Sequence, residues 1–295
     1  MSIVMPVAVG VQFAHAAVQA IADAEGIDVL HIKGPALDTV LLVHKPSLGE
    51  AAGRRDSFDA DVLVRPTQVN RLIRAMRSHG WSVRYRFEDG SNFGHASTLV
   101  HAHLAPVDLH RSFPGFGVTA GAAFASLWED RMPITIAGVA CSAPSRDAHR
   151  LILILHAVRS GDLLSEDIRR AWTEATPDER SRISACAEVL GAEVALAAGT
   201  GALARFRHRR DYRLWQALAT RQATRPRLWW AWVSAQPTAR ERARVGLRLI
   251  GPRLGRLRGS LGHRPSAADY VGALRVRVHN ELDAARRAIA ARAHK

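Results

Sequence analysis

Asp59 and Asp61 stand two positions apart in the segment FDADVLVR (58–65). The β-rich composition of this segment and the proline behind it predict a strand that stops at Pro66. Because successive strand residues face opposite sides of a sheet, the two carboxylates would point to the same side. Two like charges on a buried strand repel each other, and a divalent cation between them removes that cost. The pair therefore indicates a site for a hard metal ion, Mg²⁺ or Mn²⁺.

A third carboxylate stands in another strand-like segment, PVDLH (106–110). If this segment pairs beside the first strand, Asp108 joins the same cluster. Acidic residues spaced like Asp59 and Asp61 also occur by chance, so the combination carries more weight than the pair. Three carboxylates together with substrate phosphates form a typical Mg²⁺ environment, because Mg²⁺ favours oxygen ligands.

The turn Lys33-Gly34-Pro35 offers the complementary, anion-binding half of a site. It follows a short strand predicted at 28–33, and Pro35 suits the first position of a helix predicted over 35–43. A glycine at a helix N-terminus allows backbone N–H groups and the helix dipole to approach an anion. Lys33 and Arg55 would neutralise phosphate charge. Phosphoryl-type transfer needs mainly such positioning and charge neutralisation.

The elements that must position these residues alternate between helix and strand in the first half of the chain. The patterns predict helices over 8–25, 35–43 and 67–79, strands over 28–33, 58–65, 81–87, 97–103 and 106–110, and a hairpin over 134–142. After Pro144 the pattern becomes helical, with a buried helix over 146–160 and another that opens at the capping box 176–179 and runs towards Gly199. The sequence thus predicts an α+β domain over 1–143 and a helical domain over 144–295.

The segments HIKGPAL (31–37), RDSFDADVLV (55–64) and VDLH (107–110), with LILILHAVRSG (151–161), resemble an uncharacterised nucleotidyltransferase family. That family belongs to the DNA-polymerase-β-like nucleotidyltransferase superfamily, and the resemblance covers roughly residues 28–160. It implies a polymerase-β-like nucleotidyltransferase domain with a small mixed sheet flanked by helices, followed by an all-helical C-terminal region. Two positions depart from the pattern: Pro35 follows Gly34 where the wider superfamily generally has serine, and Ala60 replaces a larger apolar residue.

The resemblance implies transfer of a nucleoside monophosphate from a nucleoside triphosphate, such as ATP, to an acceptor by two-metal-ion catalysis. Asp59 and Asp61 match the metal-binding pair, Asp108 matches the third carboxylate, and Gly34 matches the glycine of the phosphate turn. Lys33 and Arg55 would help to hold the triphosphate. The acceptor stays open between RNA, a peptide or protein, and a small molecule. A non-catalytic nucleic-acid-binding or regulatory protein with the same fold is the alternative.

Histidines near these residues allow a different interpretation. His101 and His103 would share one face of the strand predicted over 97–103, and His110 would share a face with Asp108. Together they could form a transition-metal site of a hydrolase. We favour packing or surface roles for them, because the aspartate pair already indicates a hard cation. His156 lies on a nearly all-apolar helix and is expected to be a hydrogen-bonded core residue.

Charge is distributed unevenly along the 295-residue chain, whose formal net charge is +14. Residues 1–199 carry 19 Lys/Arg against 22 Asp/Glu, whereas residues 200–295 carry 22 against 5. The basic segment indicates an anionic partner such as RNA or, with less support, a membrane surface, although a solvated basic face is the plainer alternative. Tryptophans lie among its arginines and would either stack on unpaired bases or bury themselves against the first domain; they are Trp215, Trp229, Trp230 and Trp232.

The N-terminus lacks a basic stretch before its apolar residues, and the two cysteines form no metal-ligand spacing. A cytoplasmic location is therefore expected.

Overall fold

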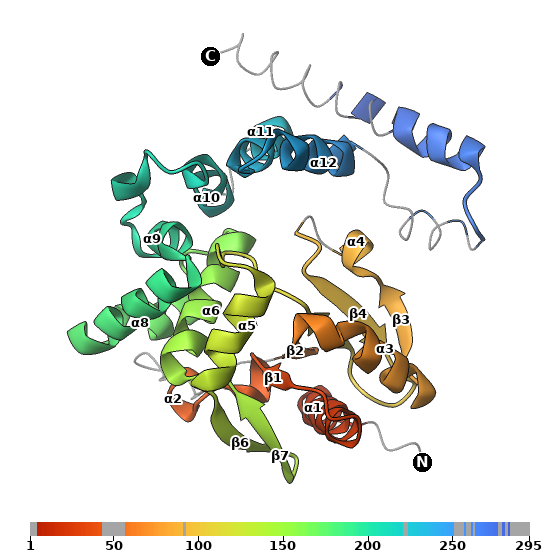
Figure 1. Cartoon of the computed structure of the whole chain (residues 1–295), viewed down its shortest axis with the longest axis vertical. Helices are drawn as coiled ribbons and strands as arrows, with labels where there is room; N and C mark the ends of the chain where they lie inside the picture. Colours follow the sequence, from red (N-terminus) through yellow and green to blue (C-terminus); the bar gives the residue numbers. More distant parts are fainter. Residues whose placement is uncertain are drawn as a thin grey trace.

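The computed structural model describes residues 5–42, 57–90, 93–220 and 224–250, with residues 257, 261, 263–276, 279–280 and 283 beyond them. Within this part of the chain a five-stranded sheet in the order β1-β2-β5-β4-β3 is flanked by helices (Figure 1). The strands are β1 (Val29–His31), β2 (Ala60–Val64), β3 (Ser82–Tyr85), β4 (Ala96–Val100) and β5 (Val107–His110). The sheet is mixed, because β2 and β5 are parallel and the other neighbouring strands are antiparallel.

Helices of very different length surround the sheet. Those before residue 130 are α1 (Val7–Ala24), α2 (Thr39–Leu42), α3 (Val69–Ser78), α4 (Phe87–Gly90) and α5 (Ala120–Glu129). A hairpin of β6 (Met132–Ile136) and β7 (Val139–Ala143) follows, as the sequence predicts. Next come the helices α6 (Arg146–Ser160), α7 (Glu166–Ile168), α8 (Pro177–Leu190), α9 (Glu193–Thr200), α10 (Tyr212–Ala219), α11 (Arg225–Ala235) and α12 (Ala239–Ile250), and residues 267–276 are helical as well.

Strand β2 divides its side chains between two apolar cores, because alternate residues face opposite sides of the sheet. Ala60, Val62 and Val64 pack in the core formed with α1 and α3. Leu63 joins the other core, which surrounds α6. Asp61 is two residues from Leu63 and therefore lies on the same side of the sheet, facing α6.

Helix α6 forms the centre of the larger core. Its N-terminus is capped by Ser145, whose side chain accepts a hydrogen bond from the backbone N–H of Ala148, and Gly161 ends it in a left-handed conformation. The residues from Leu151 to Leu155 are all fully buried, with α8 and α9 packed against the helix. The prediction of a buried helix at this place is confirmed.

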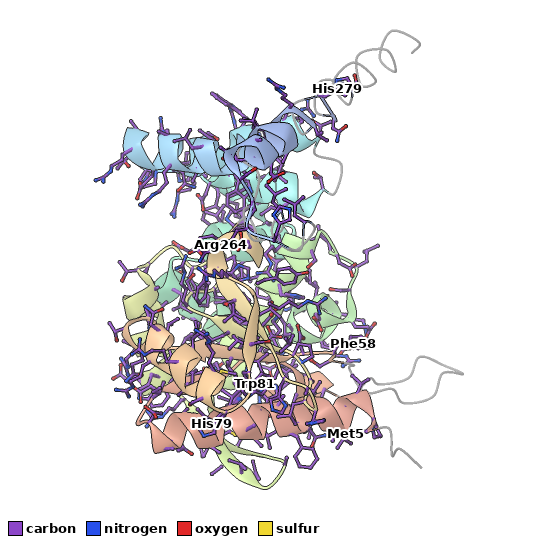
Figure 2. The ribbon with its side chains drawn as sticks, turned by 90° about the vertical axis from the view of Figure 1, so that its right-hand side faces the viewer. Met5, Phe58, His79, Trp81, Arg264 and His279 are labelled. Atoms are coloured by element: carbon purple, nitrogen blue, oxygen red, sulfur yellow. The ribbon has the colours of Figure 1, made fainter. Side chains whose placement is uncertain are left out.

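The C-terminal helices α10–α12 lie at the end of the molecule opposite to α1 (Figures 1 and 2). Two of the tryptophans are buried: Trp215 of α10 joins the core around α6, and Trp232 of α11 packs on Phe93 with 4.2 Å between ring centroids. Trp230, in contrast, is 63% exposed. The interpretation that these tryptophans anchor the helices thus holds for two of them.

The expected α+β fold with a small mixed sheet, flanking helices and a helical C-terminal region is confirmed, but two predicted helices are wrong in detail. The helix predicted over 35–43 is a 3-10 turn at Gly34–Ala36, an extended Leu37 and the short α2. The helix predicted from Pro177 towards Gly199 is interrupted at Gly191, whose left-handed backbone packs on Gly117. In both places tertiary packing overrides the local helical pattern.

Helix α1 has the length and apolar composition of a membrane-spanning helix, and half of it is buried inside the protein. It packs on β2, α3 and the hairpin β6–β7. This burial is typical of a core helix.

Candidate active site

Three potential metal ligands converge where β2 and β5 run side by side. The parallel register places Asp61 beside Asp108 and Leu63 beside His110. Val62 and Leu109 point into the α1–α3 core, so the residues that alternate with them point towards α6. Oxygen or nitrogen atoms of Asp61, Asp108 and His110 all lie within 4.8 Å of one another.

Asp61 is the most enclosed member of this cluster, with an exposed fraction of 3%. Its Oδ1 accepts a hydrogen bond from Lys33 Nζ at 2.9 Å and another from His110 Nε2 at 2.7 Å. Burial alone would raise the pKa of Asp61, but Lys33 and His110 outweigh it and hold the pKa well below its usual value. The Asp61 carboxylate is therefore kept ionised, as a metal ligand must be.

Asp108 is held from the neighbouring strand β4. Thr98 stands opposite it in the antiparallel register and donates a hydrogen bond from Oγ1 to Asp108 Oδ1 at 2.6 Å. Such a bond fixes the orientation of a carboxylate and resembles the outer contacts that orient metal ligands. His110 adds a buried nitrogen, Nδ1, that has no hydrogen-bond partner among the described residues.

Asp59 lies just before β2 and lines the same cavity as Asp61 and Asp108. Burial raises the pKa of Asp59 to about 6, and the negative charges of Asp61 and Asp108 add to the increase. The Asp59 carboxylate thus lies near two other carboxylates, and their negative charges repel one another. A bound cation would remove this repulsion. The three carboxylates, with the imidazole of His110 hydrogen-bonded to Asp61, fit a small divalent cation.

The cavity in front of these carboxylates has a volume of about 200 Å³. It is lined by Lys33, Ser57, Phe58, Asp59, Asp61, His95, Asp108, His110, His156 and Arg159. Carboxylates and the cations Lys33 and Arg159 line the same cavity, an arrangement that suits a metal ion next to an anion.

Arg159, at the end of α6, lines the cavity and is a candidate site residue that sequence reasoning missed. Its Nη1 donates a hydrogen bond to His95 Nε2 at 2.8 Å, and no carboxylate among the described residues is within ion-pair distance of it. Burial lowers the pKa of Arg159, an effect that Asp61 and Asp108 oppose. Burial also lowers the pKa of His95 to about 2, so its ring is neutral and can accept this bond.

A family model described as an uncharacterised nucleotidyltransferase matches residues 13–208, about two thirds of the chain. The chain belongs to this family. No curated protein and no solved structure matches it. The matched residues of this nucleotidyltransferase contain the whole sheet, α6 and every residue that lines the cavity.

The residues predicted for phosphate binding differ in where the structure places them. Lys33 lines the cavity but is hydrogen-bonded to Asp61. Gly34 has a left-handed backbone and does not line the cavity; the Oγ of Ser57 lies 3.1 Å from the position that a Cβ on Gly34 would occupy. The phosphate-binding role expected of Gly34 stays a prediction. Arg55 lies outside the described residues.

The histidines divide into two groups. The residues His101 and His103 follow the end of β4 rather than sharing a strand face, and His101 packs on Trp81. They do not line the cavity, so the transition-metal cluster that would have included them is wrong in its geometry. His110 and His156 do line the cavity, which corrects the expectation that His156 is a core residue. The one sequence signal for Arg159 was its position one helical turn after His156.

Proposed function

We propose that this nucleotidyltransferase moves a nucleoside monophosphate from a nucleoside triphosphate to an acceptor, with a divalent cation such as Mg²⁺ as cofactor. The observation that carries the proposal is the position of Asp61 and Asp108 on adjacent parallel strands, in one cavity with the buried Lys33 and the half-buried Arg159. Catalysis of phosphoryl-type transfer consists mainly of holding a triphosphate and neutralising its charge.

The carboxylates of Asp61 and Asp108 would hold the cation, with Asp59 as a further oxygen ligand. When bound, the cation supplies charge neutralisation at the triphosphate and a lowered pKa for the attacking group. His110 and Thr98 keep the two strand carboxylates in position by hydrogen bonds. Arg159 would bind phosphate oxygens, because its guanidinium faces the cavity without a carboxylate partner among the described residues.

The basic C-terminal helices favour an anionic macromolecule, in particular RNA, as the acceptor. Exposed arginines lie on α10 and α12, among them Arg213, Arg240, Arg242 and Arg244. Trp232 of α11 packs on Phe93, and Phe93 contacts His95 in the cavity wall. A strand bound along these helices would therefore lie close to the entrance of the site, and charge would contribute most of its affinity.

The test is label transfer from each of the four α-³²P nucleoside triphosphates, with Mg²⁺ or Mn²⁺, into a host-cell lysate separated into RNA, protein and small molecules. We expect label in one fraction with the wild-type protein. We also expect a loss of about 10³-fold in Asp61→Asn and Asp108→Asn, because each change removes a negative ligand from the site. Asn has nearly the same shape as Asp, so these variants keep the hydrogen bonds around the site better than alanine.

Asp162→Asn is the matched control, since Asp162 is exposed and does not line the cavity. It should transfer label like the wild type. Equal labelling by the wild type and both site variants would contradict the proposal. Binding of RNA without any transfer would support the non-catalytic alternative instead.

A further inference from the structure

Phe58 is the most exposed phenylalanine in the described chain, at 72%. A phenylalanine in this position forgoes the stabilisation that burial of its ring would provide. It nevertheless lies directly before Asp59 and lines the cavity with it. In Figure 2 it lies at the side of the molecule, between α1 and the C-terminal helices.

The backbone explains how the ring comes to the rim of the cavity. In a regular strand Phe58 would point to the same face as Ala60, into the core of α1 and α3. The chain instead bends at residues 58 and 59, before β2 begins. Ser57 Oγ donates a hydrogen bond to the backbone oxygen of Asp59 at 2.8 Å and so closes the bend around Phe58. The ring is presented outward by local structure.

The remaining surface of the cavity is polar. Of the ten lining residues within the described part of the chain, Phe58 alone has an apolar side chain. The cations and carboxylates suit a metal-bound triphosphate, and they leave the aromatic ring as the surface for an uncharged, flat group. Nucleobases are flat, and aromatic side chains stack on them whatever their identity.

We infer that Phe58 stacks on the nucleobase of the nucleoside triphosphate and that the site accepts all four bases. The inference rests on the proposed function and deepens it by naming the substrate class. A phenyl ring has no hydrogen-bonding group, so it adds affinity for a base without distinguishing one base from another. Arg159 binds the triphosphate, and Phe58 holds the other end of the same molecule.

The experiment compares ligands with and without a base. Dissociation constants in the presence of Mg²⁺ are measured calorimetrically for ATP, GTP, CTP, UTP and inorganic tripolyphosphate. The proteins are the wild type, Phe58→Ala, Phe58→Trp and Phe13→Ala. Phe13 is an exposed phenylalanine on α1 that does not line the cavity, so Phe13→Ala is the matched control. Because Phe58 is exposed, its substitution leaves the core intact.

We expect Phe58→Ala to weaken binding of each of the four nucleotides about tenfold, or about 1.4 kcal/mol, because the stacked ring is lost. Binding of tripolyphosphate should change less than about twofold. Phe58→Trp should bind the nucleotides at least as well as the wild type, and Phe13→Ala should bind like the wild type. The wild-type protein should bind the four nucleotides with similar affinity.

Each of the other possible results would contradict a defined part of the inference. Unchanged nucleotide binding in Phe58→Ala, or equal weakening of nucleotides and tripolyphosphate, would overturn stacking while the proposed function stands. A strong preference of the wild type for one nucleotide would overturn the tolerance for all bases. If neither nucleotides nor tripolyphosphate bound to the wild-type protein, the proposed function and the inference would both fall.

Discussion

The carboxylate face of the sheet and the C-terminal helices both concentrate charge, but they do so in opposite ways. Around Asp61 the charges are few and of both signs, and the buried pair Asp61 and Lys33 is held by a hydrogen bond. On α12 the charges are mostly of one sign, and Arg240, Arg242 and Arg244 are exposed. Buried charges interact strongly and need fixed partners, whereas exposed charges are screened and act together over a surface. The first arrangement suits chemistry at one point, and the second suits adhesion to an extended anion.

The largest expected effect on stability comes from breaking the buried ion pair. Asp61→Ala leaves Lys33 nearly buried without its carboxylate, and we expect the free energy of unfolding to fall by about 3 kcal/mol. Lys33→Met in the same variant should recover a large part of that loss, because it removes the unpaired charge. Urea denaturation of the single and double variants measures both. If the double variant were no more stable than Asp61→Ala, the unpaired charge of Lys33 would not be the cause of the lost stability.

A smaller effect is expected at the phosphate side of the site. Arg159→Ala should raise KM for the nucleoside triphosphate about 30-fold, because it removes a charge-assisted contact to the ligand. Steady-state kinetics on the labelled acceptor provide the measurement. Arg213→Ala, on the exposed surface of α10, is the control for the loss of one arginine and should leave KM unchanged at moderate salt. Equal effects of the two variants would show that Arg159 acts only through net charge.

Buried histidines predict a dependence of stability on pH. Burial lowers the pKa of His15 and of His149 to about 4, below the value of 6.5 for a free histidine. The unfolded chain therefore binds these protons first as the pH falls. Stability is present above pH 6.5 and is lost between pH 6.5 and 4. Asp59, with its pKa raised to about 6, acts in the opposite direction over this window, but it is a single group.

His31 strengthens this expectation, because its Nδ1 lies 2.7 Å from Nδ1 of His15. One of these two nitrogens must be unprotonated for the bond to exist, and burial lowers the pKa of His31 as well. Urea denaturation at pH 7.5 and pH 5 should differ by more than about 1 kcal/mol. His208→Gln, at an exposed position, should not alter the difference. Constant stability between the two pH values would mean that the histidines become protonated in the folded protein as readily as in the unfolded chain.

The smallest effects are expected from the exposed arginines of α12. Replacement of Arg240, Arg242 and Arg244 by glutamine should weaken binding of single-stranded RNA a few-fold at low salt and reduce the salt dependence of binding. Fluorescence anisotropy at several salt concentrations measures both. Binding of a mononucleotide should be the same in this variant and in the wild type. Unchanged RNA binding would show that the arginines of α12 do not contribute to binding of the acceptor.

The sequence by itself determined the local parts of the site. The strand pattern placed Asp61 on a strand, Pro66 ended that strand, and Asp108 was recognised in a second strand-like segment. The same reasoning predicted the hairpin and the buried helix α6, and the quoted motifs identified the family that the match over 13–208 confirms. These inferences succeeded because periodicity and turn chemistry are properties of neighbouring residues.

Only the tertiary structure decided which distant groups meet at the carboxylates. Register between β2 and β5 is set by packing of both faces of the sheet, and it brought His110 to Asp61. Packing of α6 across the sheet brought Arg159 to the cavity. No local pattern encodes such meetings, because they depend on the closure of loops between segments that are far apart in the chain.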